Sequence, residues 1–432
     1  MVAQRLHSAA AAWVLQCPTR VKTALVLSGG GARGAYEAGV ITYLRDELEP
    51  RLGRGIPIDI LCGTSVGAVT ACAMASTASQ PASQAAALAD FWLRLSLKQV
   101  LHVGMSDLVR SFWERGGGGL ANPGGMRELA ARIDWRSITR NIHSGRLQAL
   151  SICATRVADG RTAVFVQQTP GSSTRALDTP HYDVIHTRIG PRHALASAAM
   201  PVLFKPVTIG SRRYLDGGVR MNVPLSPALR LGAQRVIVVS MQPGSHHSDD
   251  MLSEPHRPTA VFLAGKAMNS LLQDRLDQDV ENMRRINSII EAGYASFGDE
   301  FTASMNHALD AHRASPLRYV RNFLMRPSAD LGVIAARCAR GTDFLLRHRQ
   351  LTGLFLSLLV GQESRDSADL ASYLLFDPGF AEELMDLGKA DARAREEEWV
   401  RFFDDTPLND AEAAELERVA FSASQHESAA VP

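Results

Sequence analysis

The sequence has few cysteines, and their spacing points neither to a disulfide framework nor to a metal site. Its 5 cysteines are Cys17, Cys62, Cys72, Cys153 and Cys338, and they form no Cys-x-x-Cys pair. An odd and dispersed set of cysteines fits buried, reduced thiols better than the disulfides of a secreted protein. We therefore expect a cytoplasmic protein without a metal centre.

The sequence also lacks an excess of charge of either sign. Lysine and arginine together number 46, aspartate and glutamate number 45, and the formal net charge is +1. Such a chain has no overall field that would attract nucleic acid or an anionic membrane. We expect no nucleic-acid partner, and any contact with lipid should be local and apolar.

Long hydrophobic runs are absent as well. The most apolar run, "LTGLFLSLLVG" at residues 351–361, is well short of the roughly 18 residues expected of a membrane span. The apolar stretch near the N-terminus is short, and it carries Gln16 where a secretion signal needs a small residue. Both observations favour a cytoplasmic protein that at most attaches to a membrane surface.

Short strands and helices alternate in the first part of the chain. The run "TALVLS" is typical of a buried strand, and apolar residues at helical spacing follow it from Ala35 to Leu44. A second apolar run, "PIDILCG", leads into the alanine-rich helix "AVTACAMASTAS". This repetition predicts an α/β fold around a mostly parallel sheet. Asp159-Gly160 predicts a hairpin turn, and "RRYLDGG" and "QRVIVVSM" predict two later strands.

The rest of the chain is more polar and then helical. Residues 243–259 are polar and contain proline, which is typical of a linker, and apolar residues from Met268 to Ile286 recur at helical spacing. They predict one helix of roughly thirty residues. The helices near the C-terminus are also a candidate homodimer surface. The expected organisation is an N-terminal extension (1–22), an α/β domain (23–242), a linker (243–259) and a mainly helical region (260–432).

Two glycine-rich turns follow the first two predicted strands. In "LCGTSVGAVTA", Ser65 lies between Gly63 and Gly67, a pattern that presents a nucleophile on a strand-to-helix elbow. The earlier turn, "LSGGGARGAYEAGV", offers unhindered N–H groups at a helix start, where they could stabilise an oxyanion. It also fits a dinucleotide-binding pattern, but the next strand has Asp59 in its middle instead of an acid at its end. We therefore expect no nucleotide and no cofactor.

A serine nucleophile needs a base, and the sequence offers two kinds. A Ser-Asp-His triad would need one of five histidines, none of which has a compelling setting. The stronger candidate is Asp216, where an apolar strand ends in Asp-Gly-Gly; a turn aspartate that bonds its own backbone would look the same. The five histidines are His181, His186, His193, His246 and His247.

Four blocks of the sequence together resemble patatin-like phospholipases. They are "SGGGARGAYEAGV", "GTSVGA", "ALASAAMPVLFKPV" and "YLDGGVRMNVPL", in the family's order over about residues 23–240. The resemblance implies a three-layer sandwich around a mostly parallel sheet, a Ser65 nucleophile, and an Asp216 partner that makes histidine unnecessary. It also implies an oxyanion hole among Gly29, Gly30, Gly31, Arg33, Gly34 and Val66, supported by Gly63, Gly67, Gly217 and Gly218.

The resemblance implies a hydrolase that cleaves fatty-acyl esters of phospholipids or lysophospholipids through an acyl-enzyme. Alternatives are a neutral-lipid lipase or general carboxylesterase on the same dyad, and a non-enzymatic interaction protein with a degenerate hydrolase domain. The Arg33 side chain either orients a phosphate or faces solvent. Residues 101–125, with Leu108, Phe112 and Trp113 before a glycine run, are either a mobile lid or a packed helix with a connector.

Overall fold

The computed structural model describes residues 21–96, 130–172, 179–201, 203–242, 276–298, 300–312, 316–341, 344 and 365–404. The lid candidate, the expected linker and the apolar run at 351–361 lie outside these residues. The chain divides into two compact units. One contains residues 22–276 and 322–400, and the other contains residues 1–21, 277–321 and 401–432.

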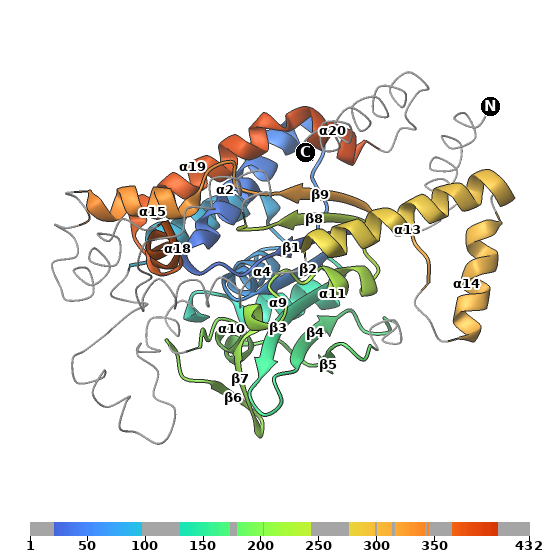
Figure 1. The fold of residues 1–432 in the computed structure, drawn as a ribbon, viewed down its shortest axis with the longest axis horizontal. Helices are drawn as coiled ribbons and strands as arrows, with labels where there is room; N and C mark the ends of the chain where they lie inside the picture. Colours follow the sequence, from blue (N-terminus) through green and yellow to red (C-terminus); the bar gives the residue numbers. More distant parts are fainter. Residues whose placement is uncertain are drawn as a thin grey trace, which may run out of the picture. The chain divides into compact units, whose positions relative to one another are not determined.

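The first unit is built around one nine-stranded sheet (Figure 1). Its main path runs β5-β4-β3-β2-β1-β8-β9, and β7 joins it beside β3 and pairs with β6. The strands are β1 (Thr23–Leu27), β2 (Ile60–Thr64), β3 (Ala149–Arg156), β4 (Thr162–Gln168), β5 (Asp183–His186), β6 (Val207–Ile209), β7 (Arg212–Asp216), β8 (Arg235–Val239) and β9 (Arg321–Met325).

The centre of the sheet is parallel, as the strand and helix alternation predicts. β1 pairs in parallel with β2 and β8, and β2 pairs in parallel with β3. Every residue of β1, β2 and β8 is buried, which is typical of parallel strands covered on both faces. The antiparallel pair of β3 and β4 confirms the predicted hairpin, whose Gly160 has a φ of 67°.

Helices of the first unit come from both ends of the chain. α4 contacts β1, β2 and β3, and α11 contacts β1, β2 and β8. The helices and turns are η1 (Gly31–Gly34), α2 (Ala35–Tyr43), η2 (Leu44–Leu48), α3 (Glu49–Leu52), α4 (Val66–Ser76), η3 (Pro81–Ser83), α5 (Gln84–Leu93), α9 (Trp135–His143), α10 (Pro191–Ser197), η5 (Gly217–Val219), α11 (Leu225–Arg230), α15 (Leu331–Arg340), α18 (Arg365–Leu374), α19 (Pro378–Ala394) and α20 (Glu396–Phe403).

Part of the C-terminal region, residues 322–400, belongs to the same compact unit as the sheet. β9 belongs to the central sheet, and α19 lies along α2 (Figure 1). Glycines bring these two helices close, because a Cβ at Gly39 would lie 2.0 Å from the Met385 carbonyl oxygen and one at Gly388 would lie 2.3 Å from that of Tyr36. The physical reason is that α2 is buried on nearly every side, so it needs a second layer of cover.

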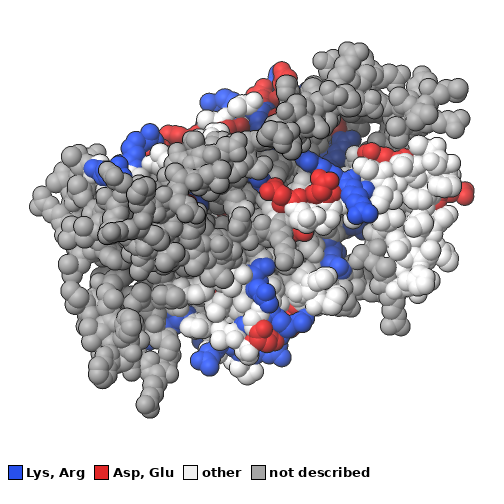
Figure 2. All heavy atoms as spheres, viewed as in Figure 1, with Lys and Arg blue, Asp and Glu red and all other residues white. Residues whose placement is uncertain are grey.

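The second unit contains α13 (Leu276–Phe297) and α14 (Phe301–Ala311). α13, with 22 residues, confirms a long helix in the part of the predicted helical stretch that the structure describes. Among the described residues, no helix is both long and apolar enough to cross a membrane. On the face drawn in Figure 2, acidic and basic side chains of described residues are interspersed, in keeping with the balanced composition.

Candidate active site

Ser65 lies on a strained turn between β2 and α4. Its φ of 55° makes it the one residue other than glycine with a positive φ among those described, a conformation that costs energy and persists only when its surroundings impose it. A Cβ at Gly63 would lie 2.3 Å from the Gly67 carbonyl oxygen, and one at Gly67 would lie 2.5 Å from that of Leu27. The elbow predicted from the sequence is therefore present, and its glycines are required by close backbone contacts.

The register of β3 brings Asp216 to Ser65. β3 pairs first with β2, up to Cys153 opposite Thr64, and then with the antiparallel strand β7, beginning with Ala154 opposite Asp216. The C-terminal ends of β2 and β7 therefore meet along one edge of β3. The Ser65 Oγ donates a hydrogen bond to Asp216 Oδ2 at 2.7 Å, although 151 positions separate the two residues.

The Asp216 carboxylate is buried and held by few donors. The Gly218 N–H donates to Oδ1 at 2.7 Å, and the Asp216 backbone is fixed by its N–H to the Ala199 carbonyl at 2.8 Å. Burial raises the pKa of Asp216 to about 6, against the hydrogen bonds from Ser65 and Gly218 that lower it. A carboxylate with a raised pKa is a better match for a serine proton than an ordinary aspartate.

Ser197 is a site residue that the sequence interpretation did not single out. Its Oγ accepts the Ser65 backbone N–H at 2.8 Å and donates to the Cys153 carbonyl at 2.6 Å. It thereby ties the strained elbow to β3 in a fully buried position. Ser197 lies in the block "ALASAAMP", but the sequence of this block does not show which of its small residues bonds Ser65.

The glycine turn lies directly beside Ser65. A Cβ at Gly29 would lie 3.1 Å from that of Ser65 and 2.3 Å from Asn222 Oδ1. The Gly29 N–H donates to the Asn222 carbonyl, and the Arg33 N–H donates to the Gly30 carbonyl, each at 3.1 Å. These two amides are therefore not available to a ligand. Gly29 and Arg33 drop out of the backbone donors that the sequence suggested for an oxyanion hole.

Three of the named amides keep open donors. The backbone N–H groups of Gly30, Gly31 and Val66 have no acceptor within the described residues. Gly31 has a φ of 57°, and it lines the same pocket as Ser65 and Val66. Gly34 has a different role, since a Cβ there would lie 2.7 Å from Val66 Cγ1. Gly217 is also a packing position, with the Cys153 carbonyl oxygen 2.3 Å from its Cβ site.

The Arg33 side chain is buried and does not face solvent. Its Nε donates to Ser372 Oγ at 2.6 Å, and its Nη2 bonds the carbonyl and the carboxylate of Asp369. The guanidinium also lies 3.8 Å from the centre of the Tyr373 ring. The solvent-facing alternative is wrong, and a substrate phosphate would have to displace Asp369 to reach this cation.

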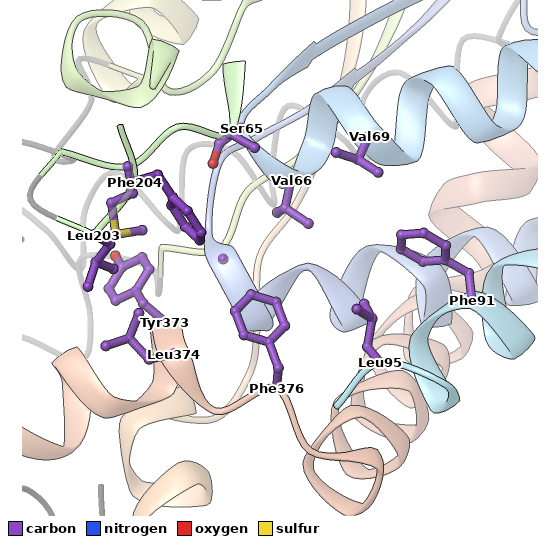
Figure 3. A pocket seen from close by; sticks show the side chains of 13 residues that line it. Ser65, Val66, Val69, Phe91, Leu95, Leu203, Phe204, Tyr373, Leu374 and Phe376 are labelled. Atoms are coloured by element: carbon purple, nitrogen blue, oxygen red, sulfur yellow. The ribbon is translucent and has the colours of Figure 1, made fainter. Parts of the chain in front are cut away.

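An apolar pocket opens over Ser65 (Figure 3). Most of its wall comes from the glycine turn, the elbow, α4, the end of α5 and the segment after α10, and the remainder comes from the C-terminal region. The Ser65 hydroxyl and the Tyr373 hydroxyl are the polar side-chain groups among its described lining residues. These residues are Gly31, Ser65, Val66, Val69, Phe91, Leu95, Ala198, Met200, Leu203, Phe204, Tyr373, Leu374 and Phe376.

Three histidines of the triad alternative lie among the described residues, and none of them forms a hydrogen bond with Ser65 or Asp216. His181 and His186 are exposed. His193 accepts the Gly190 N–H at 3.0 Å, and its ring packs on Phe165. His246 and His247 lie outside the described residues. Among the described residues there is also no cluster of side chains that could hold a metal ion.

Comparisons with known proteins find relatives of this chain among patatin-like phospholipases. Residues 25–229 match the family model for patatin-like phospholipase. The chain is 30% identical over 210 residues to the cGAMP-activated phospholipase of Pseudomonas aeruginosa, which covers 46% of this chain and 53% of that protein. It is 26% identical over 248 residues to patatin-like phospholipase domain-containing protein 7 of Mus musculus, covering 57% of this chain and 15% of that protein.

The chain therefore spans about half the length of the first of these relatives and much less of the second. Among solved structures, VipD from Legionella pneumophila aligns with 87% of this chain and 93% of the VipD chain. The sequence identity is 12% and the TM-score is 0.26. The family match covers the β1 to α11 region, where both turns, Ser65 and Asp216 lie. Residues 25–229 of the chain are therefore a patatin-like phospholipase domain.

Proposed function

We propose that this chain is a serine lipid acyl hydrolase, with Ser65 as the nucleophile and Asp216 as its proton acceptor. The observation that carries the proposal is the 2.7 Å hydrogen bond from Ser65 Oγ to Asp216 Oδ2, made at the wall of an apolar pocket. A strained turn and a carboxylate with a raised pKa are both features that concentrate at catalytic sites.

The reaction proceeds through an acyl-enzyme. As Ser65 Oγ bonds to the ester carbonyl carbon, its proton passes to Asp216 Oδ2, and the N–H groups of Gly30, Gly31 and Val66 stabilise the oxyanion. The carbon–oxygen bond to the alcohol then breaks, and the alcohol leaves with the proton from Asp216. Water next transfers a proton to Asp216 while it attacks the acyl carbon, and the fatty acid leaves as Ser65 regains its proton.

The proposed substrate is a phospholipid or lysophospholipid, taken from a lipid surface by a cytoplasmic protein. The apolar lining supports a fatty-acyl chain, and the names of the relatives favour phospholipids. A neutral-lipid ester is the second candidate, because the described lining residues include no cation to hold a phosphate. Arg33, the nearest cation of the glycine turn, is engaged by Asp369 and Ser372.

Labelling by a fluorophosphonate probe tests for an activated serine. We expect the wild-type protein to be labelled and to release fatty acid from lipid vesicles, and we expect Ser65→Ala to lose both properties while it stays folded. The substrate class follows from comparing phosphatidylcholine, lysophosphatidylcholine and triacylglycerol as substrates. Equal labelling of Ser65→Ala would show that another residue is the nucleophile and would overturn the proposal.

The rate should fall in mild acid, because Asp216 must be ionised to accept the proton. With a pKa of about 6, kcat/KM is expected to decrease about ten-fold for each pH unit below 6. Hydrolysis of a p-nitrophenyl ester, followed from pH 4 to 8, measures this fall in kcat/KM. The ester is neutral, so the substrate itself does not titrate in this range. A rate that stays constant down to pH 4.5 would show that the carboxyl which limits catalysis has an ordinary pKa.

A further inference from the structure

One wall of the Ser65 pocket is supplied by the C-terminal region. Tyr373, Leu374 and Phe376 line the pocket together with residues of the elbow, α4 and α5 (Figure 3). All three lie after residue 229, beyond the part of the chain that matches the family. This wall is therefore built by residues outside the matched domain.

On the α18 side, the wall is fixed to the glycine turn. Arg33 bonds both Asp369 and Ser372 of α18, and its guanidinium stacks on Tyr373. The Tyr373 carbonyl oxygen would lie 2.3 Å from a Cβ at Gly31, so the end of α18 rests directly on the glycine turn. Arg33 is thus a positioning residue that holds the turn and the wall together.

The wall is also fixed from the α19 side. The Phe376 N–H donates to the Leu374 carbonyl at 2.8 Å, and the Asp377 N–H donates to the Leu375 carbonyl at 2.9 Å. Asp377 then caps α19 by accepting the Gly379 N–H at 2.9 Å, and α19 packs closely on α2 through its glycine contacts. Phe376 therefore stands on a short turn that is held at both ends.

Phe376 is placed where an acyl chain would pass. In Figure 3 its ring points toward Val66, the residue after Ser65, with Leu95 beside it. The pocket continues from there to Val69 and Phe91. A chain whose carbonyl carbon lies at Ser65 and whose methylenes follow the apolar lining meets the Phe376 ring on this path.

We propose that Phe376 is a specificity-determining residue that limits the length of the acyl chain accepted by Ser65. The inference rests on the proposed function and names the part of the chain that selects its substrate. Removal of the ring opens apolar space along the path, and each further methylene buried there improves binding by roughly four-fold. Two or more additional methylenes therefore correspond to a gain of roughly ten-fold or more.

The test compares p-nitrophenyl esters of increasing chain length, from butyrate to hexadecanoate. In Phe376→Ala, the ratio of kcat/KM for the dodecanoate to that for the butyrate is expected to rise roughly ten-fold, and in Phe376→Trp the ratio is expected to fall. Leu375→Ala is the matched control, because Leu375 is fully buried next to Phe376 but does not line the pocket. It should lower thermal stability and leave the ratio unchanged.

A second measurement separates this inference from the proposed function. Dodecanoate binding to Ser65→Ala, followed by calorimetry, reports the pocket without any turnover, and Phe376→Trp in that background should weaken it. If no Ser65-dependent hydrolysis occurs but this binding depends on Phe376, the proposed function fails and the chain-length role stands. If the folded Phe376 variants change neither the ester ratio nor the binding, the role is overturned.

Discussion

Replacement of Asp216 by asparagine is expected to lower kcat by about 1,000-fold or more, within the range that a lost general base costs. The asparagine amide has nearly the shape of the carboxylate, and its oxygen can still accept the Gly218 N–H that now binds Oδ1. It cannot accept the Ser65 proton, so the nucleophile stays in its unreactive hydroxyl form. The loss should therefore appear in kcat on soluble esters and in the rate of fluorophosphonate labelling.

The same substitution is expected to stabilise the fold at neutral pH. Burial raises the pKa of Asp216 from 3.8 to about 6, so the ionised carboxylate costs the folded state on the order of 2–3 kcal/mol. This cost begins as the pH rises above 4 and is complete above about 6. It is absent at lower pH, where Asp216 is protonated in both the folded and the unfolded state. The variant should therefore gain stability relative to wild type between pH 4 and 7, but little at pH 3.5.

Thermal unfolding at several pH values measures this effect, with Asp159→Asn as the control. Asp159 is an exposed turn carboxylate that pairs with Arg156, so its loss should leave hydrolysis unchanged. An Asp216→Asn protein that is folded and fully active would show that Asp216 is a structural turn residue. In that case another residue would have to be the proton acceptor for Ser65.

Replacement of Gly67 by alanine is expected to destabilise the protein by more than about 3 kcal/mol, above the usual cost of overpacking. Its Cβ would lie 2.5 Å from the Leu27 carbonyl oxygen and 2.6 Å from that of Ser28. Both atoms belong to the backbone where β1 enters the glycine turn, and neither can move without shifting that turn. The variant should lose hydrolysis as well, because both turns of the site lie at this contact.

Chemical denaturation measures the loss, and Gly55→Ala is the matched control. Gly55 is exposed, and the nearest atom to its Cβ site is Glu49 Oε1 at 4.0 Å. Its substitution should change the free energy of unfolding by less than about 0.5 kcal/mol. A Gly67→Ala protein as stable as the Gly55 control would show that the elbow can relax, and the packing argument would then be wrong.

Local patterns in the sequence predicted much of the fold. The apolar runs before each glycine turn, and the helical spacing after them, identified β1, β2, α2 and α4, because such periodicity reflects which faces are buried. The Asp159-Gly160 pair predicted the β3 and β4 hairpin for a similarly local reason. The four blocks identified the family, since their order and separation are very unlikely to arise by chance.

The candidate site could be predicted only in part from the sequence. The sequence named Ser65 and Asp216 and the amides of Gly30, Gly31 and Val66, but it also included Gly29 and Arg33, whose N–H groups are engaged. Which amide stays open depends on where the Asn222 carbonyl lies and on how η1 closes. Neither is encoded in the spacing of the glycines themselves.

The sequence by itself identified the residues that we propose to carry chemistry: a serine on an elbow, an aspartate at a strand end and a row of glycines. Only the tertiary structure decided that β2 and β7 end at the same edge of β3, that Ser197 holds the elbow, and that α18 engages Arg33. The reason is physical, since strand register and long-range hydrogen bonds depend on segments distant in sequence. Local periodicity reports whether a face is buried, but not which distant segment covers it.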